Sequence, residues 1–129
     1  MKDTQSLTSH PQSLGPLQGI RVVEGGQMVA AAYAAKLMAD LGAEVIKVEE
    51  PAGDPARRRG PYPGQVPQPE KSGLFLYLNT NKLGVTLNLQ SAQGQGLLRR
   101  LLQGADLLVH NYPPARMLTL HFCLPSFAN

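Results

Sequence analysis

The sequence predicts an α/β protein built on an open parallel sheet of Rossmann-like type with flanking helices. Three observations lead to this prediction: short β-branched runs alternate with segments of helical period, the connections between them are mostly short, and glycine or proline stands where the runs end. Alternating strands and helices are typical of parallel sheets with right-handed crossovers. Because a parallel sheet needs cover on both faces and the chain offers few helices, we expect the fold to be incomplete.

The first unit lies between residues 17 and 42. Ile20, Val22 and Val23 predict a strand that ends at residues 24–26. The apolar period then changes to three and four residues, which predicts a helix over residues 28–41 with Gly42 as its cap. The apolar stripe of this helix consists of Ala30, Tyr33, Leu37 and Leu41, with Ala34 and Met38 beside it.

A second strand and a long loop follow. Val45, Ile46 and Val48 predict the strand, and residues 49–51 end it because proline lacks the donor that a sheet needs. Residues 51–71 contain six prolines and three glycines, which predicts a loop that is either functional or disordered. The pattern of residues 74–78 fits a helix and a strand equally well.

The third unit and a fourth strand complete the pattern. Alternation at Val85, Leu87 and Leu89 predicts a strand, and Ser91 is placed to cap the helix that Gly104 ends. The helix has an apolar and a basic face. The leucines are Leu97, Leu98, Leu101 and Leu102, and the arginines are Arg99 and Arg100. Residues 107–109 predict the fourth strand, which residues 110–114 close.

Length and composition limit the organisation of the chain. With 129 residues we expect one domain, preceded by a polar leader at residues 1–15. The net charge of +3 is compatible with an anionic ligand or with a need for solubility. A single cysteine, Cys123, fits a reducing compartment, and the chain has neither a signal-peptide pattern nor an apolar run of membrane length. We therefore expect a cytoplasmic protein without a membrane partner.

Ligands of open α/β sheets bind at the carboxyl ends of the strands, here residues 24–27, 49–54, 87–91 and 110–113. Gly25 and Gly26 precede a helix amino end, where free N–H groups favour an anion, although a glycine pair can equally serve only to turn the chain. A nucleotide dehydrogenase is disfavoured, because the sequence GGQMVAA lacks the required glycine spacing.

Other classes of site find little support. The run Arg57–Arg59 could bind phosphates but is more simply a solvated loop, and nucleic-acid binding is disfavoured by the scarcity of aromatic residues. The three histidines lack metal-ligand spacing, so we expect no metal site. No catalytic residue can be assigned, because Asp40, Asp54 and Asp106 are each interpreted as solvent-facing.

Four segments nevertheless resemble the family III CoA-transferases, the group of formyl-CoA transferase, carnitine CoA-transferase and methylacyl-CoA racemase. These segments are PLQGIRVVE, YAAKLMADLGAEVIKVEEPAGDPAR, LNTNKLGVTLNLQSAQGQGLLRRLL and ADLLVHNYPPARM. Together they cover residues 16–117 as an amino-terminal family segment. The resemblance implies an interlocked homodimer and an enzyme that transfers CoA between carboxylic acids through an aspartyl-CoA thioester. Racemase or isomerase chemistry on acyl-CoA, or a non-catalytic CoA-binding or assembly fragment, remains the alternative.

The resemblance also implies contacts to coenzyme A or acyl-CoA as substrate, with no permanently bound cofactor. Contacts carried over to this chain involve Val29, Ala30, Leu87, Gln90, Asn111 and Tyr112. At Val29 some members have a glutamine. Glu50, Gln90 and Thr119 stand where relatives have cations that face CoA phosphates, so affinity is expected to be low.

The end of the chain departs from the family pattern. Residues 118–129 form a divergent, apolar tail, and in similar proteins the catalytic aspartate follows the segment present here. We therefore expect a truncated and inactive form of the enzyme, with a natural short variant as the alternative.

Overall fold

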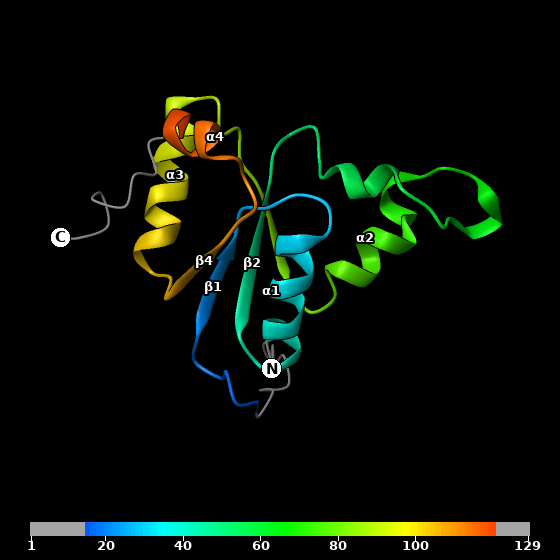
Figure 1. Ribbon diagram of the computed structural model, residues 1–129, viewed down its shortest axis with the longest axis horizontal. Coiled ribbons are helices and arrows are strands. Elements are labelled where there is room, and N and C mark those ends of the chain that lie inside the picture. Colours follow the sequence, from blue (N-terminus) through cyan, green and yellow to red (C-terminus); the bar gives the residue numbers. More distant parts are fainter. Residues whose placement is uncertain (1–14, 121–129) are drawn as a thin grey trace, which may run out of the picture.

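The computed structural model describes residues 15–120, which form one four-stranded parallel sheet (Figure 1). The strands are β1 (Arg21–Glu24), β2 (Glu44–Glu49), β3 (Leu83–Thr86) and β4 (Leu107–Val109). Their order across the sheet is β3-β2-β1-β4, so β1 is paired on both sides. This arrangement confirms the predicted α/β class and parallel sheet.

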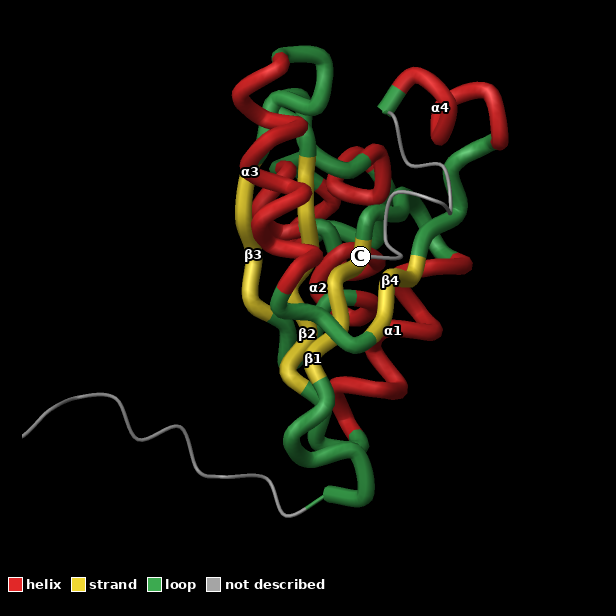
Figure 2. The backbone as a smooth tube through the Cα atoms, turned by 90° about the vertical axis from the view of Figure 1, so that its left-hand side faces the viewer, coloured by secondary structure: helices red, strands yellow, loops and turns green. Residues whose placement is uncertain are grey.

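Helices lie on both faces of the sheet. Helix α1 (Ala30–Asp40) covers one face and α3 (Ala92–Gln103) the other, as Figure 2 shows with the sheet between them. The short helix α2 (Gly73–Leu78) lies beside α1, and α4 (Pro114–Thr119) lies above the carboxyl ends of the strands. Residues 74–78, for which the sequence left two possibilities, are therefore helical.

The register of the strands divides the core into two layers. Val22 and Val45 are paired and face α1, whereas Val23 and Val48 face α3. The same alternation puts Glu24 and Lys47, which are paired with each other, on the α1 face. Two opposite charges therefore enter the buried layer at the carboxyl edge.

The extent of α1 agrees with the prediction, but the face that packs against the sheet is not its apolar stripe. Small side chains pack against the sheet, whereas the predicted apolar stripe points outward: Tyr33, Leu37 and Leu41 are 43–47% exposed. Alanine allows a helix to approach a sheet closely, and its short side chain adds little to an apolar pattern. The buried positions are Ala31, Ala32, Ala35 and Ala39.

The third strand begins and ends earlier than predicted. It stops at Thr86, so that Leu87 and Leu89 follow it and are buried beneath α3. Ser91 caps α3 as expected, because its Oγ accepts a hydrogen bond from the N–H of Gly94 at 3.0 Å. Gly104 ends this helix, and Gly42 ends α1 with a φ of 101°.

The proline-rich segment between β2 and α2 is ordered as three short 3-10 turns, at Pro55–Arg58, Pro63–Gln65 and Pro69–Lys71. Proline occupies the first position of each turn, where its missing N–H costs nothing. Asp54 caps the first turn and Ser72 caps α2. Nearly all of the predicted leader and most of the predicted tail lie outside the described residues.

Candidate functional site

The turn between β1 and α1 lies at the point where the strand order reverses, because β2 and β4 flank β1 on opposite sides. Gly26 has no room for a side chain there: a Cβ would lie 2.2 Å from Ala31 Cβ and 2.8 Å from Asn111 Oδ1. The glycine therefore allows β1, α1 and the segment after β4 to approach each other closely.

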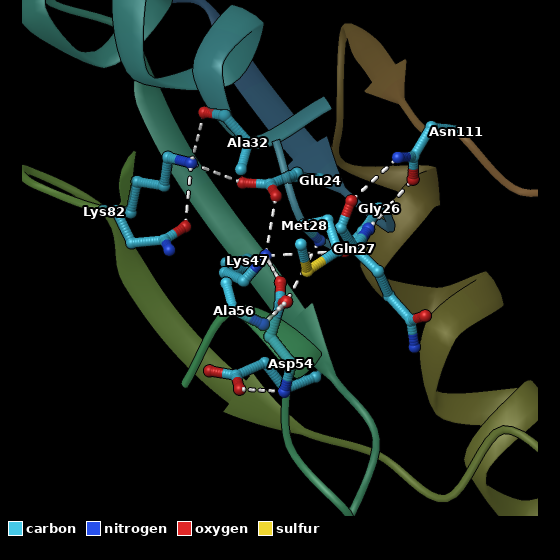
Figure 3. Close-up of polar contacts among 12 residues, drawn as sticks. Glu24, Gly26, Gln27, Met28, Ala32, Lys47, Asp54, Ala56, Lys82 and Asn111 are labelled. Carbon is cyan, nitrogen blue, oxygen red and sulfur yellow. Dashed lines mark hydrogen bonds and ion pairs between the residues drawn. The ribbon is translucent and has the colours of Figure 1, made fainter. Parts of the chain in front are cut away.

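Asn111 connects this turn to the segment after β4. Its Oδ1 accepts a hydrogen bond from Gln27 N at 2.9 Å, and its Nδ2 donates to Gln27 O at 2.7 Å (Figure 3). The amide thus pairs with both backbone groups of one residue, as a neighbouring strand would. A predicted ligand contact therefore holds the turn with its own side chain.

Val29 and Ala30 lie immediately after this turn, and both are exposed. Val29 is the N-cap residue of α1 and no side chain caps the helix. The free N–H groups of the first helical turn and the positive end of the helix dipole favour an anionic ligand group. This part of the predicted site is accessible.

Tyr112 lines a crevice between the β1–α1 turn and the loop after β2. The crevice is lined by Gly26, Glu50 and Tyr112 among others and has no space for a water molecule. Burial and, second, the Glu50 carboxylate raise the pKa of Tyr112 to about 12. Arg116 lies over the same ring, with its guanidinium 5.0 Å from the ring centre.

A second, open pocket of about 310 Å³ lies between α4 and the start of α3. It is lined by Leu89, Gln90, Gln95, Arg116, Thr119 and Leu120. Two of the three positions at which the chain lacks a family cation, Gln90 and Thr119, therefore share one pocket. Arg116 supplies a positive charge there, and it forms an ion pair with the third position, Glu50.

Leu87 differs from the other predicted contacts because its side chain belongs to the core. It is 9% exposed and packs in the layer beneath α3. Its N–H donates to Glu49 O at 2.9 Å. The predicted residues thus divide into three groups: Val29, Ala30, Asn111 and Tyr112 surround one turn, Gln90 lines the open pocket, and Leu87 is buried.

A buried cluster of charges beneath the β1–α1 turn was missed by sequence reasoning. Asp54, interpreted as solvent-facing, is 3% exposed, and its Oδ2 lies 2.9 Å from Lys47 Nζ. Lys47 also donates to Glu24 Oε1 at 2.7 Å, and Lys82 donates to Glu24 Oε2 at 2.7 Å (Figure 3). Burial in particular lowers the pKa of Lys82. By contrast, Asp40 and Asp106 are exposed, as predicted.

A signal for this cluster was present in the sequence. Lys47 interrupts the β-branched run from Val45 to Val48, and strand alternation places it on the same face as Val45. A lysine on the buried face of a central strand requires an acidic partner. Glu24, at the aligned position of the first strand, supplies it.

Arg57 also differs from its interpretation as part of a solvated run. Its Nε and Nη2 each donate to a carboxylate oxygen of Glu49 at 2.8 Å, and the guanidinium lies 3.7 Å from the centre of the Phe75 ring. Burial alone would raise the pKa of Glu49, but the bonds from Arg57 and from Asp54 N outweigh burial and lower it. Arg58 and Arg59 are exposed.

Within residues 15–120, no group of three or more His, Cys, Asp or Glu side chains is arranged to hold a metal ion. In the same range, no helix is both long enough and apolar enough to cross a membrane.

Comparison with known proteins decides the family. The model of CoA-transferase family III matches residues 17–123. The chain belongs to this family. It is 40% identical over 94 residues to cinnamoyl-CoA:phenyllactate CoA-transferase of Clostridium sporogenes, covering 73% of this chain and 23% of that protein. It is 36% identical over 115 residues to succinyl-CoA:glutarate CoA-transferase of Mus musculus, and this match covers 85% of this chain and 26% of that protein.

Solved structures agree with this assignment. A CAIB/BAIF family protein from Brucella suis superposes with a TM-score of 0.77 at 30% identity, covering 88% of this chain and 30% of that one. The protein Rv3272 from M. tuberculosis gives a TM-score of 0.75 at 36% identity, covering 88% and 31%. The present chain spans about a quarter of the length of the curated relatives that it matches.

Proposed function

We propose that this chain forms the coenzyme A-handling part of an enzyme that transfers CoA between carboxylic acids through an aspartyl-CoA thioester. Family membership is the observation that carries the proposal, and the named relatives are CoA-transferases rather than racemases. In such an enzyme a covalent intermediate divides one difficult exchange into two easier steps. The acyl donor and acceptor are a CoA thioester and a carboxylic acid.

The arrangement of the carboxyl edge supports a role in holding CoA. Val29 and Ala30 present an uncapped helix amino end, and Arg116 places a guanidinium in the open pocket with Gln90 and Thr119. We propose that Arg116 contacts a CoA phosphate in place of the cations that are absent from the other two positions. Glu50 opposes this contact, because it already occupies the guanidinium.

None of the described aspartates is proposed as the nucleophile. Asp54 is engaged by Lys47, Met28 N and Ala56 N, and Asp40 by Lys36. Asp106 accepts a hydrogen bond from Arg21 N at 2.8 Å, at the amino edge of the sheet. We therefore expect no acyl exchange from this chain alone and no covalent CoA adduct when it is incubated with an acyl-CoA and analysed by mass spectrometry.

Calorimetric titration with CoA tests the binding proposal. The chain should bind CoA weakly, Arg116→Gln should reduce the affinity about tenfold, and Glu50→Gln should increase it because it releases the guanidinium. Arg100→Gln, on the exposed face of α3, is the matched control and should leave the affinity unchanged.

Titration with pantetheine, which lacks the phosphates of CoA, tests whether Arg116 contacts a phosphate. The affinity of the chain for pantetheine should be the same with and without Arg116→Gln. Absence of any heat at millimolar CoA, or an equal loss with Arg100→Gln, would contradict the proposal.

A further inference from the structure

Four buried side chains beneath the β1–α1 turn form a connected network that the proposed function does not use. Two are carboxylates, Glu24 and Asp54, and two are ammonium groups, Lys47 and Lys82, so their formal charges cancel. Each side chain is at most 2% exposed. The lysines share Glu24, one on each carboxylate oxygen, and Lys47 bridges to Asp54.

Each branch of the network reaches the backbone of the turn or of the helix after it (Figure 3). Asp54 Oδ1 accepts a hydrogen bond from Met28 N at 3.0 Å. Lys47 donates to Gly26 O at 3.4 Å, and Lys82 donates to Ala32 O at 2.7 Å. Three side chains therefore converge on the seven consecutive residues 26–32. They are Lys47 of β2, Asp54 of the loop after β2, and Lys82, which precedes β3.

Within residues 26–32, the backbone of Met28 adopts a conformation that is unfavourable for residues other than glycine. Met28 has a φ of 60°, in the left-handed region where a residue with a Cβ is strained. The N–H of Met28 donates a hydrogen bond to Asp54 Oδ1. The same oxygen accepts a hydrogen bond from Ala56 N at 2.8 Å. One carboxylate oxygen thus joins the strained turn to the loop after β2.

The chemistry of the cluster favours a role in positioning. Burying an ion pair contributes little net stability, because the loss of hydration offsets the attraction between the charges. Such a pair does fix geometry, since each charge must keep its partners once it is buried. The Asp54 to Lys47 contact is an ion pair without hydrogen-bond geometry, whereas the bonds from Asp54 to the backbone are well directed.

We propose that Asp54, held by Lys47 and the Glu24–Lys82 pair, fixes the conformation of residues 27–30 and so acts as a positioning residue for the ligand contact at Val29 and Ala30. The ligand part of this inference rests on the proposed binding of CoA. The structural part does not, because the contact between Asp54 and the turn lies within the chain itself.

Amide hydrogen exchange measured by NMR tests the structural part directly. In Asp54→Ala the Met28 amide loses its acceptor and should exchange at least about tenfold faster, with altered shifts at Gln27, Val29 and Ala30. Asp54→Asn keeps an acceptor oxygen but loses the charge, so its effect should be smaller. If Asp54→Ala does not fold, Asp54→Asn is measured in its place. Altered amide chemical shifts at residues 27–30 are then the expected result.

Asp106→Ala is the matched control. Asp106 also accepts a backbone N–H with its carboxylate, at 2.8 Å from Arg21 N, but it does so at the amino edge of the sheet. A general loss of stability would affect residues 27–30 equally in both variants. Equal changes in the two variants, or unchanged amides at residues 27–30 in the Asp54 variants, would overturn the inference.

Titration of the same proteins with CoA tests the ligand part. Asp54→Ala should reduce CoA affinity several-fold at a temperature where both variants are folded, and Asp106→Ala should not reduce it. Changed amides with unchanged affinity would overturn the positioning role. If the unaltered chain fails to bind CoA, the proposed function fails, and the exchange data still decide whether Asp54 fixes the turn.

Discussion

Gly26 is the residue at which three segments meet most closely. A methyl group there would overlap Ala31 Cβ and press on Asn111 Oδ1. We predict that Gly26→Ala destabilises the chain by about 1–3 kcal/mol, because the backbone must shift to admit the side chain. The free energy of unfolding in urea measures this effect.

Gly84→Ala provides the control for that substitution. No atom lies within 4 Å of the position that a Cβ would take at Gly84 in β3. Alanine is therefore expected to be neutral or slightly stabilising there. Equal losses of stability in the two variants would show that close packing at Gly26 is not the cause.

Tyr112 should make the stability of the chain depend on pH in the alkaline range. Its pKa is raised from 10.0 to about 12, so folding favours the neutral phenol. The stabilisation is complete below the unfolded pKa and is lost as pH rises from about 10 through about 12. Unfolding measured between pH 9 and pH 12 should show this loss, and Tyr112→Phe should reduce it. An unchanged slope in Tyr112→Phe would contradict the prediction.

The sequence does not reveal which contacts single residues make within the fold. Asn111 and Tyr112 were identified through the family resemblance, and both lie at the predicted edge. Single residues, however, do not reveal that Asn111 pairs with Gln27, because that contact joins positions 84 residues apart. Asp54 was misjudged for a different reason: its partner Lys47 is close in sequence, but the buried face of β2 on which Lys47 lies was not considered.

At the scale of elements, the loop between β2 and α2 depends on Arg57. Its guanidinium joins Glu49 at the end of β2 to Glu70 near α2 and stacks on Phe75. We predict that Arg57→Ala lowers the free energy of unfolding by about 1–3 kcal/mol and exposes residues 51–71 to proteases. Arg59→Ala, at an exposed position of the same loop, is the control. Equal rates of cleavage in both variants would contradict the assignment.

Most elements, though not all of their faces, followed from the sequence. Three of the four strands and both long helices lie close to the predicted positions, because β-branched runs and helical periods report local structure. The packed face of α1 did not follow from the sequence, because its largest apolar residues lie on the exposed side of the helix. The third strand was displaced because Leu87 and Leu89 continue the alternation of Val85 after the strand itself has ended at Thr86.

At the scale of the whole molecule, the outer side of α1 presents an exposed apolar stripe. Tyr33, Leu37 and Leu41 recur every fourth residue, and Leu76 and Tyr77 of α2 are also exposed. The homodimer that the family resemblance implies would require surfaces of this kind. We predict that the chain self-associates through the stripe and that Leu37→Asp shifts its mass in sedimentation equilibrium towards the monomer.

Leu97→Asp is the control for that experiment. Leu97 is an exposed leucine of similar accessibility, 41% against 46% for Leu37, but it lies on α3 across the sheet. The variant should leave the mass unchanged. A monomeric unaltered chain at the highest soluble concentration would contradict self-association through α1.

The order of the strands has a consequence for how the chain folds during synthesis. The central strand β1 leaves the ribosome first, and its partner β2 follows after a short interval, since Glu24 and Lys47 are 23 residues apart. The partner on its other side, β4, comes much later: Arg21 and Asp106 are 85 residues apart. One edge of β1 therefore remains open while α1, β2, β3 and α3 are made, and closure of this long loop should be the slow step of folding. The nascent chain thus carries an unpaired strand edge until β4 has been made, and this is the period in which non-native pairing with another chain is easiest.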